Sequence, residues 1–107
     1  MKSSYQNLDR GDIIFVNLNP TRDHEPCMVL SKQNRYLDSM IGVAPITSKS
    51  KPFPLHVPLP ENSRVHGEVL LEHHRMIDVA ERGFQYVETA SKEVVSECLA
   101  KIKLLYV

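Results

Sequence analysis

The chain has 107 residues, of which 42% are apolar, and its 13 basic and 13 acidic side chains cancel to a formal net charge of zero. This length favours one compact domain over residues 1–107, which would bury roughly 60 to 70% of the surface that the unfolded chain exposes. The balanced charge excludes a broad electrostatic attraction to nucleic acid, so any site for a polyanion has to be local. No stretch has the apolar length of a membrane-spanning helix or of a secretory signal, so we expect a cytoplasmic protein.

Five short strands are predicted in the first two thirds of the chain. They lie at residues 12–18, 27–32, 39–48, 53–59 and 67–74. The first has the clearest pattern, because Ile14, Val16 and Leu18 occupy alternate positions and would share one face. The fourth contains Pro54 and Pro58, which suit an edge strand or a bulge better than a central strand.

The connections between these strands are rich in turn residues, and no helical period separates them. This pattern favours a mainly β (α+β) fold, in which the strands form a small closed or half-closed barrel and not a parallel sheet. A short turn of helix is also predicted within residues 77–83, ending at Gly83.

The last part of the chain, residues 91–105, has a helical pattern. Apolar side chains recur there at intervals of three and four residues, which is typical of one face of a helix. They are Val95, Cys98, Ile102 and Leu105. Ser91 is the expected N-cap, and lysines toward the last turn complement the helix dipole. We expect this helix to close the open end of the barrel.

Neither the cysteines nor the histidines have the spacing of a metal site. Cys27 and Cys98 lie among apolar residues and are predicted to be buried thiols, with a disulfide between them as the alternative. His73 and His74 are adjacent, so on a strand they would point to opposite faces. A Gly-rich phosphate loop and a GxSxG motif are both absent, and we therefore predict neither a metal nor a cofactor.

Three clusters of polar residues lie at or just beyond the ends of predicted strands. They are RDHE at 22–25, PITSKSK at 45–51 and EHHR at 72–75. Together they offer what RNA cleavage without metal requires: a base for the ribose 2′-hydroxyl, a cation for the phosphate and an acid for the leaving oxygen. Structural roles stay open as well, because Thr47 and Ser48 could cap a turn and Glu25 could pair with Arg22.

Four longer motifs follow one another along the chain. They are RGDIIFVNLNPTRDHE at 10–25, VLS at 29–31, APITSKSKPFPLHV at 44–57 and GEVLLEHHRMIDVAERG at 67–83. In this order, and followed by the terminal helix, they resemble the MazF/PemK family of toxin endoribonucleases from type II toxin-antitoxin systems. The resemblance implies an SH3-like β-barrel of about five to seven strands with a C-terminal helix.

The same resemblance implies a function and a set of partners. The implied function is metal-independent, sequence-selective cleavage of single-stranded RNA, including mRNA, through attack of the 2′-hydroxyl. The implied partners are a cognate antitoxin, the RNA and a second copy of the chain in a homodimer. DNA would be contacted only through the antitoxin, and no membrane is involved.

Matched residue by residue, the resemblance implies catalytic roles for Glu25, Thr47, His73 and Arg75. Thr47 corresponds to the hydroxyl residue that helps to hold the scissile phosphate. Arg75 corresponds to the arginine of an LxDQxR motif, in which His73 replaces the usual glutamine. Contacts to the substrate are implied for Arg22, His24, Ser48, Lys49 and Glu72.

The chain departs from the family pattern after Glu25. Family members have about five residues, ending in an arginine, between this glutamate and the proline that opens the second strand, a length difference that loops often tolerate. Here Pro26 follows Glu25 directly, so the arginine that stabilises the phosphate charge has no counterpart. We expect Arg75 and His73 to replace it, with the charged residues of the preceding loop as the alternative source.

Two other functions remain open because of this departure. One is a catalytically weakened or inactive module that binds antitoxin or RNA and regulates its own operon. The other is a toxin directed at gyrase, as in the structurally related CcdB family.

Overall fold

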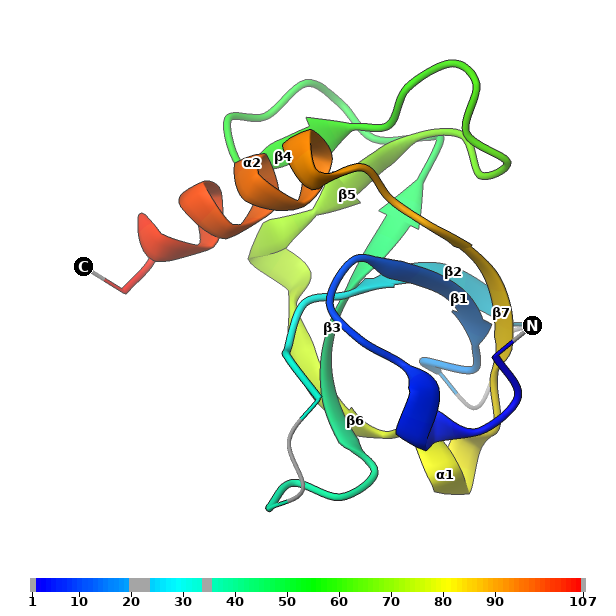
Figure 1. The fold of residues 1–107 in the computed structure, drawn as a ribbon. Coiled ribbons are helices and arrows are strands. Elements are labelled where there is room, and N and C mark those ends of the chain that lie inside the picture. Colours follow the sequence, from blue (N-terminus) through cyan, green and yellow to red (C-terminus); the bar gives the residue numbers. More distant parts are fainter. Residues whose placement is uncertain (1, 20–23, 34–35, 107) are drawn as a thin grey trace.

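The computed structural model describes residues 2–19, 24–33 and 36–106, and most of them belong to an antiparallel sheet with a helix near the C-terminus (Figure 1). The strands are β1 (Asp12–Val16), β2 (Glu25–Val29), β3 (Met40–Thr47), β4 (His56–Pro58), β5 (Glu68–Leu70), β6 (Arg75–Asp78) and β7 (Gln85–Thr89). The helical elements are η1 (Tyr5–Asn7), η2 (Leu71–His73), α1 (Val79–Arg82) and α2 (Lys92–Lys103). The prediction of a mainly β (α+β) fold is confirmed.

The long strand β3 organises the sheet. The strand order is β4-β5-β3-β2-β1-β7, and β6 pairs with β3 outside this path. One edge of β3 pairs with β2, while the other edge pairs first with β6 and then with β5. The sheet is strongly curved (Figure 1). Among the described residues no ladder joins β4 to β7, so this order has two ends and does not close.

Apolar side chains pack on both faces of the sheet because successive residues of a strand point to opposite sides. On one face, Ile13 and Met28 pack with Val94 and Cys98 of α2. On the other face, Ile14, Val16 and Leu18 belong to a second buried cluster, which confirms the face predicted for the first strand. The protein therefore has two hydrophobic cores, one between the sheet and α2 and the other on the opposite face of the sheet.

Two strand predictions need correction. β2 begins at Glu25 instead of residue 27, because Glu25 and Pro26 pair with Val16 and Phe15 of β1. The strand predicted over 67–74 ends at Leu70 and is followed by the 3-10 turn η2. The chain turns there because β5 and β6 both pair with the same edge of β3, so it has to step from one position along that edge to the next.

The structure also differs from the sequence prediction at β4, β6 and β7. β4 is shorter than the predicted strand over 53–59, but it lies at the end of the strand order, as its prolines indicate. β6 and β7 were missed as strands. The short helix α1 begins only after β6, and Gly83 is its C-cap, so the helix stops where the sequence predicted. Gly83 has a φ of 72° and a ψ of 163°, a conformation that is essentially restricted to glycine.

The terminal helix confirms its predicted start and part of its predicted face, since Cys98 is buried and Ile102 packs against the core beneath the helix. Ser91 is the N-cap, and its Oγ accepts a hydrogen bond from the backbone N–H of Val94 at 3.3 Å. The buried residues are Val94 and Cys98. Leu105, which was predicted on this face, lies beyond the end of the helix and is 40% exposed. The helix packs on β4 and η2.

Both cysteines are free and buried, so the alternative of a disulfide is wrong. Burial raises the pKa of the Cys27 thiol to about 12 and that of Cys98 to about 11. Cys98 lies beside Met28 beneath the helix, with 3.9 Å between the sulfur atoms. Within the described parts of the chain, no helix is both long enough and apolar enough to span a membrane.

Candidate active site

Glu25 and Thr47 are brought together by the register of two neighbouring strands. Cys27 of β2 lies opposite Pro45 of β3. Extending this antiparallel register by two residues places Glu25 opposite Thr47, at the end of both strands. Because side chains alternate along a strand, Glu25 and Thr47 point to the same side of the sheet as Cys27 and Pro45.

Arg75 reaches the same region from the other edge of β3. It is the first residue of β6 and lies opposite Val43. Its Nη1 donates a hydrogen bond to the carbonyl oxygen of Leu18 at 3.2 Å. In the same way, Arg82 donates to the carbonyl oxygen of Asn17 at 2.7 Å, so two arginines hold the segment that leaves β1.

These residues border a cleft of about 680 Å³. Its polar lining residues are Asn19, Glu25, Thr47, Ser48, Lys49, His66, His73 and Arg75. The four residues for which the sequence implies catalytic roles are therefore all in the lining. Among the described lining residues, the positive charges of Lys49 and Arg75 outnumber the one carboxylate, that of Glu25. A local site of this kind suits an anion even though the chain as a whole is neutral.

Some of the residues predicted to contact substrate line the cleft, and others do not. Ser48 and Lys49 line the cleft, whereas the exposed His24 and the half-buried Glu72 are not in its lining. Glu72 instead contacts His56, with 2.7 Å between Oε2 and Nε2. Arg22 lies outside the described residues.

Thr47 has a structural role in addition to its place in the cleft. Its Oγ1 accepts a hydrogen bond from the backbone N–H of Lys49 at 3.2 Å, so the turn-capping alternative is correct. A hydroxyl that accepts through a lone pair keeps its own hydrogen for donation to another group. The turn therefore fixes the position of Thr47 without using up its donor.

His66 is a lining residue that the sequence reasoning missed. The following residue, Gly67, has a φ of 130°, and a Cβ atom built on it would lie 2.5 Å from the carbonyl carbon of Thr47. This close approach brings the turn before β5 against the end of β3 and so places His66 at the cleft. The glycine next to a histidine, directly before a strand, was the available signal.

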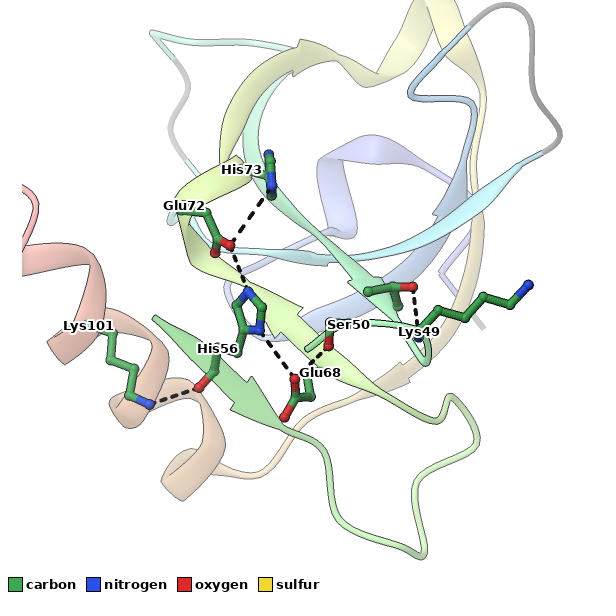
Figure 2. A network of polar contacts seen from close by, with 8 residues as sticks. Lys49, Ser50, His56, Glu68, Glu72, His73 and Lys101 are labelled. Atoms are coloured by element: carbon green, nitrogen blue, oxygen red, sulfur yellow. Dashed lines mark hydrogen bonds and ion pairs between the residues drawn. The ribbon is translucent and has the colours of Figure 1, made fainter. Parts of the chain in front are cut away.

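A second missed residue is His56, which the sequence assigned only to a strand. Its side chain is 7% exposed and lies between two carboxylates, those of Glu68 and Glu72 (Figure 2). Ser50 donates to Glu68 at 2.6 Å, and Lys101 of α2 donates to the backbone carbonyl of His56 at 2.8 Å. This polar network connects β4, β5, η2 and α2.

Comparison with known proteins identifies the family. The model of the PemK-like, MazF-like toxins of type II toxin-antitoxin systems matches residues 9–106. The chain belongs to this family.

Individual relatives of the MazF/PemK family agree over nearly the full chain. The chain is 35% identical to the endoribonuclease toxin ChpB of Escherichia coli K12 over 108 aligned positions, which cover 89% of this chain and 90% of ChpB. It is also similar to a chain in a crystal structure of MazE-MazF from Deinococcus radiodurans, with 30% identity, a TM-score of 0.81, and coverage of 92% of this chain and 93% of that one. MazF from the same organism has a TM-score of 0.83 at 28% identity, with 92% and 94% covered.

Among the described residues, no group of three or more His, Cys, Asp or Glu side chains is arranged to hold a metal ion. The site is consequently described by its carboxylate, hydroxyl, imidazole and cationic groups.

Proposed function

We propose that this chain is the toxin of a type II toxin-antitoxin pair and acts as an endoribonuclease on single-stranded RNA. The observation that carries the proposal is the gathering of Glu25, Thr47, His73 and Arg75 in one cleft of a MazF/PemK family member. The endoribonuclease toxin ChpB, with 35% identity over most of both chains, supports the same activity.

The proposed reaction begins at the ribose 2′-hydroxyl. Glu25 acts as the general base and takes the proton, and the 2′-oxygen then attacks the adjacent phosphorus. The bond from phosphorus to the 5′-oxygen breaks, which leaves a 2′,3′-cyclic phosphate on one product and a 5′-hydroxyl on the other. His73 donates the proton that the 5′-oxygen acquires. Glu25 takes up one proton and His73 releases one, so the step needs no oxidant, reductant or metal ion.

The phosphate charge that grows in this step requires donors fixed in advance. Arg75 is proposed as the main cation, because its guanidinium is oriented by the Leu18 carbonyl and has other N–H groups left to donate. The Thr47 hydroxyl and the Lys49 ammonium group, which lie on the turn after β3, complete the anion site.

The partners are proposed from the relatives. A solved structure of MazE-MazF from Deinococcus radiodurans supports a cognate antitoxin as a partner of this chain. A homodimer, contact with DNA through the antitoxin alone, action in the cytoplasm and a single SH3-like domain over residues 1–107 are proposed on the family resemblance. The strong curvature of the sheet supports the barrel, although its strand order is open among the described residues.

The second candidate is a module that binds RNA or antitoxin without cutting. It is favoured by the sequence after Glu25, where Pro26 follows directly and the family arginine has no counterpart. Removing one preorganised donor typically lowers a rate by a factor on the order of 10² to 10³. The two candidates therefore differ in turnover and not in binding.

Cleavage of a long single-stranded RNA in EDTA distinguishes them. We expect 3′ ends that carry a cyclic phosphate, and we expect Thr47→Val to reduce the rate by a factor on the order of 10² while RNA binding changes little. Ser96→Ala, an exposed hydroxyl on α2, is the control and keeps the full rate. Tight binding by the wild type with no products at high protein concentration would instead establish the binding module.

A further inference from the structure

His56 lies between two carboxylates that come from different elements. Its Nε2 is 2.7 Å from Oε2 of Glu72 in η2, and its Nδ1 is 3.3 Å from Oε1 of Glu68 in β5 (Figure 2). The imidazole itself is buried and is not part of the cleft lining. Its two ring nitrogens therefore face protein groups and not a substrate.

The number of available hydrogens decides the protonation state in this geometry. An ionised carboxylate only accepts hydrogen bonds, and a neutral imidazole has a single N–H to donate. Two hydrogen bonds from His56 to two carboxylates thus require both ring nitrogens to carry hydrogen, which is the imidazolium form. A neutral ring would leave one nitrogen lone pair directed at a carboxylate oxygen.

Both carboxyl groups are disposed to be ionised. The hydrogen bond from Ser50 is the main reason that the pKa of Glu68 lies below its ordinary value. Burial alone would raise the pKa of Glu72, but the hydrogen bond from His56 and the backbone N–H of Glu72 outweigh it, so this pKa is also lowered.

Other charged groups near His56 complete the local balance. Lys101 of α2 donates to the backbone oxygen of His56 at 2.8 Å and lies 3.9 Å from Glu97. His73 lies 3.9 Å from Glu72, and the ring of Phe53 packs on the imidazole at 5.3 Å between centroids. The charge of Lys101 also contributes to the lowered pKa of Glu68.

Each of the two carboxylates is connected to a different part of the cleft lining. Glu68 also accepts the Ser50 hydroxyl at 2.6 Å, and Ser50 ends the turn that carries Thr47 and Lys49. Glu72 directly precedes His73, which the same turn of η2 presents to the cleft. His56 is the one side chain in Figure 2 that contacts both carboxylates.

We propose that His56 is a positioning residue: as an imidazolium, it clasps Glu68 and Glu72 and so fixes the turn at residues 47–50 relative to His73. This inference rests on the proposed function for its catalytic consequence. The clasp itself exists whether or not the protein cleaves RNA, and it is testable without substrate.

The first experiment measures the ¹⁵N chemical shifts of the histidine rings at neutral pH. We expect both nitrogens of His56 to have imidazolium shifts, and we expect Glu72→Gln to convert the ring to a neutral tautomer, because an amide can donate as well as accept. Glu97→Gln, on the exposed side of α2, is the matched control and leaves the His56 shifts unchanged. A neutral His56 in the wild-type protein overturns the clasp, whatever the protein does to RNA.

The second experiment tests the link between the turn at residues 47–50 and His73. In His56→Gln, which removes the imidazolium between Glu68 and Glu72, we expect the backbone amide signals of Ser50 and His73 to shift together. Movement of one segment without the other overturns the positioning role.

Activity provides a third readout. If the wild type cleaves RNA, His56→Gln should lower kcat by a factor on the order of 10 to 100, as expected for displaced catalytic groups, with little change in KM. A folded variant with unchanged kcat overturns the proposal. Absence of cleavage by the wild type would count against the proposed function. The NMR measurements would then decide alone whether His56 holds Glu68 and Glu72 together.

Discussion

Arg75 carries much of the proposed chemistry because of where its guanidinium is held. It lies in the cleft, and its hydrogen bond to the Leu18 carbonyl orients the planar group without neutralising its charge. A planar cation with several N–H groups matches two phosphate oxygens at once, which a lysine ammonium group cannot do. The role therefore depends on the shape of the side chain as well as on its charge.

Replacing Arg75 tests this role directly. We expect Arg75→Lys to lower kcat for RNA cleavage by a factor on the order of 10 to 100 and Arg75→Ala by 10² to 10³, because a preorganised donor is lost in each case. Arg64→Ala is the matched control, since Arg64 is exposed and does not line the cleft. Equal rates for the lysine variant and the wild type would show that any nearby positive charge suffices.

At this scale the sequence predicted the residues that the family resemblance assigns to the site, which include Glu25, Thr47 and Arg75. It predicted no role for His66 or His56. Each looked ordinary in its local setting, one in a turn and one in a strand. Their surroundings are created by contacts with residues distant in the chain, which local patterns do not encode.

Among the elements, the turn before β5 is the most sharply constrained. Gly67 combines a φ of 130° with an approach to Thr47 that leaves no room for a Cβ atom. Gly83, at the end of α1, also has a positive φ, of 72°, but a Cβ atom there would meet nothing within 4 Å. Substitution of Gly83 therefore tests the cost of the backbone conformation, whereas substitution of Gly67 adds a steric clash to that cost.

We predict that Gly67→Ala destabilises the protein by about 3 kcal/mol or more, whereas Gly83→Ala costs about 1 to 3 kcal/mol, the penalty for a non-glycine residue in a backbone conformation that is essentially restricted to glycine. Urea unfolding of both variants provides the measurement. Similar losses of stability would mean that β3 and the turn move apart easily, and the cleft wall would then be less rigid than the structure indicates.

The start of α2 gives a second prediction for an element. Ser91→Ala removes the hydrogen bond to the Val94 amide, and loss of such a cap typically lowers the free energy of unfolding by about 1 kcal/mol. Ser96→Ala, an exposed serine on the same helix, should change it much less. Equal effects in thermal unfolding would show that the cap contributes nothing beyond helix propensity.

The missed strands have a common physical cause. β6 is only four residues long, and its sequence RMID runs straight into the helix α1, so it resembled the beginning of that helix. Its extended conformation follows from pairing with β3. Among the described residues, β7 pairs only with β1, and its side chains are half-buried or exposed, which weakens the alternation that marks a strand. Tertiary pairing decided both conformations.

At the scale of the whole molecule, the lowered carboxyl pKa values make stability depend on pH. Glu68 and Glu72 have pKa values below the ordinary 4.5, and the pKa of Asp9 is lowered from 3.8, first by the backbone N–H of Arg10. A depressed pKa means that the ionised group stabilises the fold above the unfolded-state value, and that this contribution is lost as the pH falls through the folded-state value.

We therefore expect the unfolding midpoint in urea to decrease as the pH falls from about 5 to about 3. Glu72→Gln should have a flatter dependence over this range, because one of the responsible groups no longer titrates. Glu61→Gln, which alters an exposed glutamate, is the control and should retain the wild-type slope. A midpoint that rises on acidification would contradict the lowered values.

The assembly of the cleft is the property that the sequence could predict least. The motif order identified which residues to examine, but Glu25, Thr47 and Arg75 meet only because β2 and β6 pair with opposite edges of β3 in a particular register. A shift of one residue in either ladder would turn a side chain to the other face. The spacing of these residues in the sequence does not determine the register of strand pairing.

The beginning of β2 at Glu25 has a consequence for how this family member could diversify. The candidate base is part of a paired strand, opposite Val16, and not of the connection that precedes it. Its position is consequently independent of the length and composition of that connection. We therefore expect changes of residues within the connection between β1 and β2 of this chain to alter which RNA is admitted while leaving the carboxylate in place. The part of the site that can vary is thus separate from the part that has to stay fixed.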